Sequence, residues 1–139
     1  MVIEGPNLKQ NERNEEQMKW EEVSYEELRG AQNYLKGYLL NQKLMRLDRY
    51  ERAYFGFEDR EGDLPDDLPL AKARMFAIRH DLMKMENSDE KLLLYYHYIR
   101  GESVERCAEL LGVSRSSAFR MKKRALIGFA LLLRKKQIG

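Results

Sequence analysis

Apolar residues along this chain recur mostly at spacings of three and four, and no stretch alternates apolar and polar residues with a period of two. Side chains at that spacing share one face of a helix, so we predict an all-α protein. A long first helix should follow the sequence Ser24 to Glu27, which has the form of a capping box. It is expected to run to about Tyr54, with Gly56 as its stop and an inward face of Leu28, Ala31, Leu35, Tyr38, Leu39 and Met45.

Two shorter helices are predicted after an acidic loop. Pro69 suits the first turn of the second helix, because its missing N–H would have no partner there. This helix should end at Asn87 and bury one stripe: Leu70, Ala73, Phe76, Ala77, His80 and Met83. Ser88 is expected to cap a third helix and Gly101 to end it. The inward residues of the third helix would then be Leu92, Leu93, Tyr96 and Ile99.

The last third of the chain has the pattern of a helix-turn-helix. A short helix should begin after Ser103, and Gly112 is expected to break it in a left-handed conformation. Ala108 is small enough for two helices to cross closely, Val113 can fill the space between them, and Ser114 can cap the second helix. That second helix is expected to bury Ala118, Met121 and Ala125 and to continue through Phe129 and Leu132.

The exposed side of this second helix carries the residues that we expect to contact DNA. Arginine can bond two guanine acceptors at once in the major groove, and lysine can neutralise phosphates. Serine can donate to either a base or a phosphate. Together with the serines at the two helix starts, the predicted DNA-binding residues are Ser103, Ser114, Arg115, Ser116, Ser117, Arg120, Lys122, Lys123 and Arg124.

Charge is unevenly distributed, which strengthens this interpretation. The 139 residues carry a net charge of +2. Residues 1–70, however, hold 10 Lys/Arg against 16 Asp/Glu, and residues 71–139 hold 15 against 7. Residues 112–139 contain eight basic residues and no acid. Such asymmetry points to a polyanionic partner at the C-terminal end, and double-stranded DNA fits it. A solvated basic helix face is the alternative explanation.

Composition argues against several other classes. Cys107 is the only cysteine, so no disulfide can form within the chain, and we expect it to be a small buried hydrophobe. No apolar run approaches the ~20 residues that span a bilayer, so we expect a cytoplasmic protein without membrane contact. The aromatic cluster Tyr95, Tyr96 and Tyr98 is expected mainly in the core rather than stacked on bases.

We expect no enzyme activity, no metal and no cofactor. His80 and His97 lie on different predicted helices without neighbouring ligands. The acidic loop with Asp59, Glu61 and Asp63 lacks the glycine and glutamate positions of a calcium-binding loop. No phosphate-binding glycine loop or nucleophile motif occurs.

A family resemblance is carried by three short motifs: Tyr95-Tyr96-x-Tyr98-x-x-Gly101-x-Ser103, Cys107-Ala108-x-x-Leu111-Gly112-Val113-Ser114 and Arg124-Ala125-Leu126. They resemble the fourth, promoter-reading region of bacterial sigma factors, over roughly residues 88–133. In layout, the whole chain resembles phage-encoded late-gene transcription regulators of the ArpU and RinA type. The region of full sigma factors that binds core polymerase has no counterpart in this sequence.

The resemblance implies a phage or prophage transcriptional regulator that activates late genes, with RNA polymerase as a further candidate partner. The expected organisation is a flexible polar segment, residues 1–22, a helical region, residues 23–87, and a DNA-binding module, residues 88–139. Two alternatives remain: a small terminase-like packaging protein, and a sigma-region mimic that binds polymerase or another host protein.

A homodimer is also a candidate. Four apolar residues off the main stripe of the last helix either pack on the first helix or form the dimer seam: Phe119, Leu126, Leu133 and Ile138.

Overall fold

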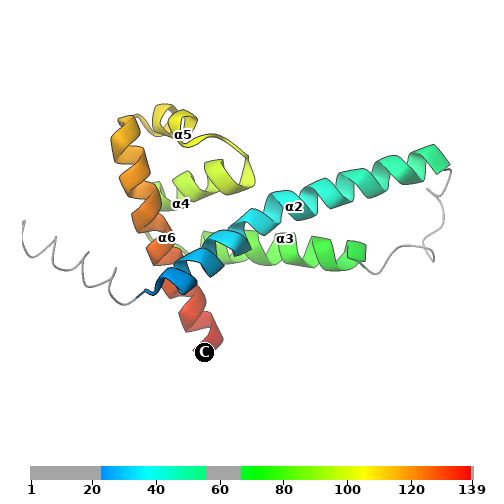
Figure 1. Cartoon of the computed structure of the whole chain (residues 1–139), viewed down its shortest axis with the longest axis horizontal. Helices are drawn as coiled ribbons and strands as arrows, with labels where there is room; N and C mark the ends of the chain where they lie inside the picture. The colour runs from blue at the N-terminus through cyan, green and yellow to red at the C-terminus, as the bar shows by residue number, and fades with distance from the viewer. Residues whose placement is uncertain (1–22, 56–66, 139) are drawn as a thin grey trace, which may run out of the picture.

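The computed structural model describes residues 23–55 and 67–138, and these residues form helices and no strand. Figure 1 shows α2 (Tyr25–Phe55), α3 (Asp67–Met83), α4 (Ser88–Leu94), the π-helical η2 (Tyr95–Ile99), α5 (Val104–Leu111) and α6 (Arg115–Ile138). The predicted all-α class and long first helix are confirmed. The polar segment before residue 23, Gly56 and the acidic loop lie outside the described residues. None of the described helices is long and apolar enough to cross a membrane.

The helices are arranged around α6, which contacts α2, α3, α4 and α5. α3 runs back along the second half of α2, and this pair extends away from the other helices as the α2–α3 arm (Figure 1). One hydrophobic cluster contains residues from all these helices, from Val23 to Ala130, so residues 23–87 and the predicted DNA-binding module share one core. Its largest fully buried apolar side chains are Phe129, Leu35, Ile78, Leu82, Leu93, Leu94 and Cys107.

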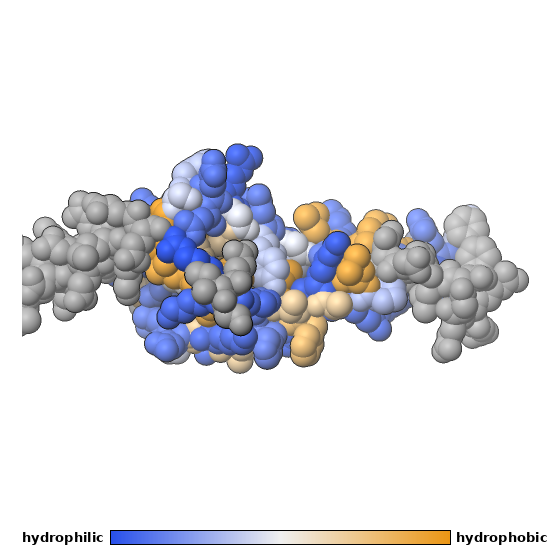
Figure 2. Space-filling model, turned by 90° about the horizontal axis from the view of Figure 1, so that it is seen from below, coloured by the Kyte–Doolittle hydropathy of each residue, from blue (hydrophilic) through white to orange (hydrophobic). Residues whose placement is uncertain are grey.

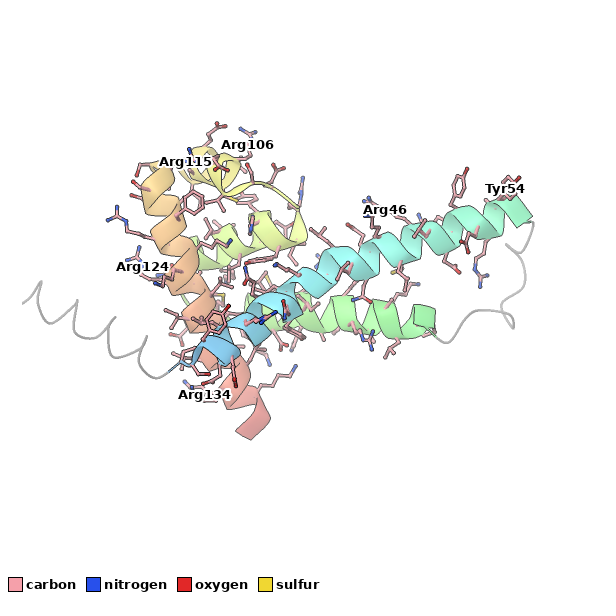
Figure 3. All side chains as sticks on the ribbon, viewed as in Figure 1. Arg46, Tyr54, Arg106, Arg115, Arg124 and Arg134 are labelled. Carbon is pink, nitrogen blue, oxygen red and sulfur yellow. The ribbon has the colours of Figure 1, made fainter. Side chains whose placement is uncertain are left out.

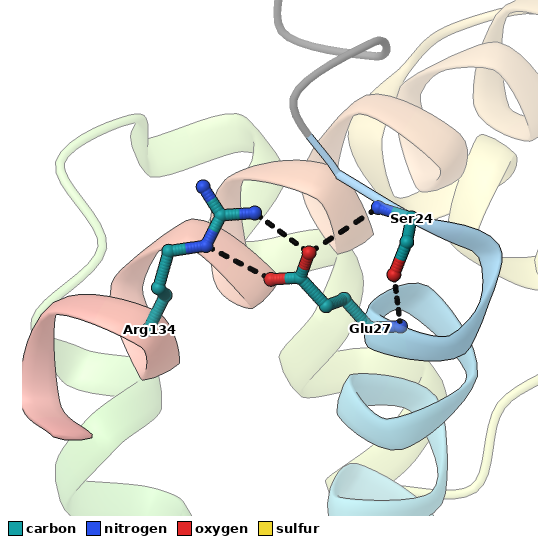
Figure 4. Close-up of polar contacts among 3 residues, drawn as sticks. All are labelled: Ser24, Glu27 and Arg134. Carbon is teal, nitrogen blue, oxygen red and sulfur yellow. Dashed lines mark hydrogen bonds and ion pairs between the residues drawn. The ribbon is translucent and has the colours of Figure 1, made fainter.

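The first helix begins with the predicted capping box. The backbone N–H of Glu27 donates to the Ser24 hydroxyl at 3.1 Å, and the backbone N–H of Ser24 donates to the Glu27 carboxylate at 3.3 Å. The same carboxylate also accepts two hydrogen bonds from Arg134, at 2.7 and 2.9 Å (Figure 4). The Arg134 guanidinium and the Ser24 N–H together hold the pKa of Glu27 below its usual value. The cap therefore also ties the start of α2 to the end of α6, which the sequence did not indicate.

The buried stripe predicted for the second helix is wrong. Leu70, Phe76 and Met83 are exposed, and His80 stacks on Phe76 at the surface. Figure 2 shows hydrophobic side chains exposed on the surface of the molecule. Ala73 is exposed as well, and Ala77 is only half-buried. The face that packs inward carries Ala71, Ile78, Asp81 and Leu82. Both faces of α3 have apolar residues at helical spacing. The predicted stripe was the face without Asp81, whereas the face that packs inward includes this charged residue.

A buried carboxylate explains which face of α3 packs inward. Asp81 has no exposed surface, and its Oδ2 accepts hydrogen bonds from the Tyr34 hydroxyl at 2.7 Å and the Lys136 ammonium at 2.9 Å. Burial opposes ionisation, but the bonds from Lys136 and Tyr34 outweigh it, so the pKa of Asp81 is lowered. A buried charge is tolerated only when it is paired in this way. Residues from α2 and α6 thus determine the orientation of α3.

The third helix begins one residue earlier than predicted, because Ser88 is its first residue and not its cap. It ends as predicted, with Gly101 left-handed after η2 at φ 74°. Asn87, expected to end the second helix, instead caps α4 through its side-chain oxygen, which accepts from the Glu90 N–H at 3.0 Å. α3 already ends at Met83. After Leu94 the turn widens into η2, which shifts the inward positions. Leu93 and Ile99 are buried as expected, but Leu94 and Tyr98 are buried in place of Leu92 and Tyr96. In the first helix, Ala31, Leu35 and Tyr38 are buried as expected, whereas Leu39 is exposed.

Replacing Asp81 by alanine should destabilise the protein by about 2–3 kcal/mol, because it removes two charge-assisted hydrogen bonds while Lys136 regains water. Tyr34→Phe removes one of these bonds and should cost about 1 kcal/mol. Urea unfolding followed by circular dichroism measures both. Glu86→Ala, at an exposed position between α3 and α4, is the control and should stay within about 0.5 kcal/mol of the parent.

The same carboxylate should make stability depend on pH under acidic conditions. A lowered pKa in the folded state means that the unfolded chain binds the proton more tightly. The stabilisation is therefore complete above the unfolded pKa of about 4 and is lost as pH falls through the folded value. Unfolding free energies measured between pH 7 and pH 3 should fall less steeply for Asp81→Asn than for the parent. Parallel curves would show that Asp81 does not titrate in this way.

Candidate nucleic-acid interface

The predicted helix-turn-helix is present in α5, the turn and α6. The Ser103 hydroxyl accepts from the Arg106 N–H at 3.1 Å and caps α5. Gly112 is left-handed, with φ 69° and ψ 34°. The Ser114 hydroxyl accepts from the Ser117 N–H at 3.1 Å and caps α6. These three predictions from sequence are confirmed.

Small residues allow α5 and α6 to cross closely. Ala108 on α5 and Ala118 on α6 are both buried, and Cys107 beside them is fully buried. Val113 is half-buried and packs against the core. Its backbone N–H donates to the Ala108 carbonyl at 3.0 Å, which fixes the turn. The predicted burial of Cys107, Ala118 and Ala125 is confirmed, whereas Met121 is only half-buried against the core. Burial raises the pKa of Cys107.

Most of the predicted DNA-binding residues share the outer side of α6. The exposed ones are Arg115, Ser116, Arg120, Lys123 and Arg124, and Ser117 is half-buried beside them. Figure 3 shows Arg115 at the start of α6 and Arg124 further along on its outer side. No acid lies in the first turn of α6, so the positive end of the helix dipole is not neutralised from within the helix.

Arg115 lies at the junction of the two helices. Its guanidinium is 3.1 Å from the Glu105 carboxylate of α5, and the two side chains are 72% and 48% exposed. It also lies over the ring of Phe119, 5.8 Å from the ring centre. An ion pair this exposed contributes little to stability. The Arg115 guanidinium can therefore leave Glu105 and bind a phosphate or a base edge at a small cost in free energy. Phe119 is therefore part of the outer face and does not pack on the first helix.

The serines at the start of α6 form a connected polar group. The Ser114 hydroxyl lies 2.8 Å from the Ser117 hydroxyl and 3.4 Å from that of Ser116. The Arg120 guanidinium reaches back to the Ser117 hydroxyl at 3.5 Å. A ligand that approaches the end of α6 therefore meets hydroxyl donors and a guanidinium in one place.

Lys122 differs from the other predicted cations. It is half-buried, and its ammonium lies 5.9 Å from the ring centre of Tyr98. Burial and the nearby Lys36 lower its pKa. The structure thus places Lys122 on the inner side of α6. Ser103 is exposed, and its hydroxyl is used as the cap of α5.

Two cations that sequence reasoning did not select extend the basic surface onto α2. Apart from a hollow of about 520 Å³ on the α2–α3 arm, the surface has a hollow of about 470 Å³ between α2 and α6. Its lining includes Arg29 and Lys36 of α2 together with Lys123 of α6. Their spacing of seven residues places Arg29 and Lys36 on one face of α2, which is the signal in the sequence that points to them.

No family model, curated protein or solved structure matches this chain. The motif over residues 95–126 therefore remains a resemblance, and the function is inferred from the geometry of α5, α6 and the adjoining face of α2.

Other chemistry is sparsely represented in the part of the chain that the structure describes. No group of three His, Cys, Asp or Glu side chains lies close enough there to hold a metal ion. His97 Nδ1 lies 2.7 Å from the Glu102 carbonyl, and burial lowers the pKa of this histidine. Tyr98 is buried, and Tyr95 and Tyr96 pack partly buried against the core. The expectation that this tyrosine cluster serves mainly the core is confirmed.

The turn can be tested with two glycines that have equal space around them. A Cβ added at Gly112 or at Gly30 meets no atom within 4 Å. Gly112 is left-handed, so Gly112→Ala should cost about 1–2 kcal/mol. Gly30 is inside α2, so Gly30→Ala should stabilise by about 0.5–1 kcal/mol. Thermal unfolding of both variants should give shifts of opposite sign. Equal shifts would contradict the role of backbone conformation at the turn.

Proposed function

We propose that this protein binds double-stranded DNA with its helix-turn-helix. The observation that carries the proposal is the outer side of α6, where Arg115, Arg120, Lys123 and Arg124 lie within three turns of a helix that follows a well-formed turn. The second helix of such a motif enters the major groove with its N-terminal residues toward the base edges. An α-helix matches the width of that groove.

The residues divide into two roles according to their position. Arg115, Ser116 and Arg120 lie in the first two turns of α6 and face the base edges. Lys123 and Arg124 lie further along the helix and contact phosphates. Arg29 and Lys36 of α2 border the hollow that Lys123 also lines, so they continue the phosphate contacts beside the helix. Lys122 has no part in this interface because its ammonium is directed toward Tyr98.

The biological role that we infer is regulation of transcription from phage or prophage late promoters, most simply as an activator. The support is the resemblance of residues 88–133 to the promoter-reading region of sigma factors. An activator that binds upstream of a promoter would also contact RNA polymerase. The α2–α3 arm, which extends away from α6, presents a surface for such a contact (Figure 1).

Alanine at Arg115 or Arg120 should weaken binding to the preferred DNA site by about 10- to 100-fold each, which corresponds to about 1–3 kcal/mol per base contact. The site would first be selected from a random duplex library, and affinities would then be measured by gel shift at fixed salt. Arg74→Ala, an exposed arginine on α3, is the matched control and should bind like the parent. Circular dichroism verifies that each variant folds.

Lys123→Ala should instead reduce affinity for all duplexes alike and lower the slope of log affinity against log salt by about one. Parent-like affinity in both arginine variants would reject the proposed interface. A parent that binds no duplex even at low salt but is retained by RNA polymerase would favour the sigma-region mimic. A large ring in native mass spectrometry would favour the terminase-like alternative.

A further inference from the structure

The second half of α2 has an apolar stripe on the side that the core does not use. Leu40, Leu44, Leu47 and Tyr54 are separated by four, three and seven residues, which is the heptad spacing of a coiled coil. Tyr50 flanks them. These five side chains are between 46% and 75% exposed. A helix that packs on one neighbour needs one apolar face, and this half of α2 has two.

The stripe lies opposite the face that packs on α3. Tyr38 and Met45 point toward α3, and they fall about half a turn around α2 from Leu40, Leu44 and Leu47. Leu40, Leu44 and Leu47 are 68%, 46% and 56% exposed, so the described residues leave about half or more of each side chain uncovered. In Figure 1 this half of α2 extends beyond α4, and α3 runs beside it.

We propose that the stripe of Leu40, Leu44 and Leu47 is the dimer seam of the protein, packed against the same stripe of a second copy in antiparallel orientation. A surface that repeats every seven residues is complementary to itself, because each leucine enters a hole formed by the leucines of the facing helix. Leu44 and Leu47 of one copy then pack against Leu47 and Leu44 of its partner. A two-fold axis relates the two copies, as in most homodimers.

The orientation follows from the shape of the chain beside the stripe. A Cβ added at Gly101 would lie 3.6 Å from Leu39, so the loop after η2 contacts α2 just before the stripe begins. In a parallel pair, the two η2 loops would meet at the same end of the seam and hold the helices apart. In an antiparallel pair, the two loops lie at opposite ends of the seam, each beside the last turn of the partner's α2.

The charged residues that flank the stripe agree with this orientation. Lys43 is exposed on one flank, and an antiparallel partner places its Tyr50 ring there, which allows a cation–π contact. On the other flank Asp48 is already bonded to Arg52 at 2.7 Å, so the two copies of Asp48 do not repel strongly. Glu51 takes the heptad position between Leu47 and Tyr54 and weakens the seam. The result is a reversible dimer.

The alternative seam considered from sequence, on the last helix, is not available. Leu126 and Leu133 pack partly buried against the core of their own chain, and the side chain of Ile138 lies outside the described residues. Phe119 is exposed, but it stands beneath Arg115 on the face proposed for DNA. The seam on α2 leaves that face uncovered, so dimerisation does not depend on DNA binding and can be tested without it.

Sedimentation velocity of the full chain over a range of micromolar concentrations tests the proposal. The parent should shift from monomer to dimer as concentration rises. Leu44→Glu and Leu47→Glu should each remain monomeric over that range. Glu51→Leu should tighten the dimer at least about tenfold, because a leucine replaces a carboxylate in the seam. Leu70→Glu, at a leucine of matched exposure on α3, is the control and should dimerise like the parent.

Cysteine crosslinking tests the orientation. Leu44→Cys mixed with Leu47→Cys should form a mixed disulfide dimer on oxidation, whereas Leu44→Cys alone should not, and buried Cys107 does not compete. A parent that stays monomeric throughout would overturn the proposal. So would a dimer that survives both glutamate substitutions, a control that also dissociates, or crosslinking of Leu44→Cys with itself, which indicates a parallel pair.

Discussion

The buried carboxylate of Asp81 is the constraint on which the arrangement of the helices depends. An ionised group inside a core is stable only where it is paired, and the two donors to Oδ2 of Asp81 come from α2 and α6. Tyr34 is on α2 and Lys136 is on α6, so α3 can pack in only one rotation about its own axis. Phe76 and Met83 face outward as a result, although either would have filled a core position by size and polarity. The hydrophobic effect favours burial of some face of α3, and the carboxylate decides which.

Much of the fold follows from local sequence signals. The capping box at Ser24, the left-handed Gly112 and the serine caps of α5 and α6 were predictable because each depends on residues within a few positions of one another. The rotation of α3 was not, since it depends on Lys136, which is 55 residues away from Asp81 along the chain. The widened turn of η2 was also missed, because its spacing differs from that of the α-helix. The exposure of four cations and Ser116 on α6 was predictable from their pattern, whereas the inward position of Lys122 and the adjoining Arg29 and Lys36 required the packing of α2 against α6.

α6 has two structural roles, and the residues for each role lie in different halves of the helix. Its first three turns have a small-residue inner face and a basic outer face, and they complete the helix-turn-helix. Its later turns bury Ile127, Phe129 and Ala130 among the other helices, and Arg134 and Lys136 pair with Glu27 and Asp81. The basic residues of the C-terminal segment are therefore not equivalent. Those near the start of α6 are presented to solvent, while two near its end hold the fold together.

Because α6 is one unbroken helix of 24 residues, it behaves as a rigid rod about 36 Å long. One end of this rod is the surface proposed for DNA, and the other end is anchored to α2 and α3 by two ion pairs. Each degree by which the rod tilts displaces one end relative to the other by about 0.6 Å, a length comparable to the tolerance of a hydrogen bond. If the proposed interface binds DNA, the angle at which α6 meets the duplex would depend in part on these contacts at its distant end, so a change at Glu27 or Asp81 would alter the docking angle without touching the interface.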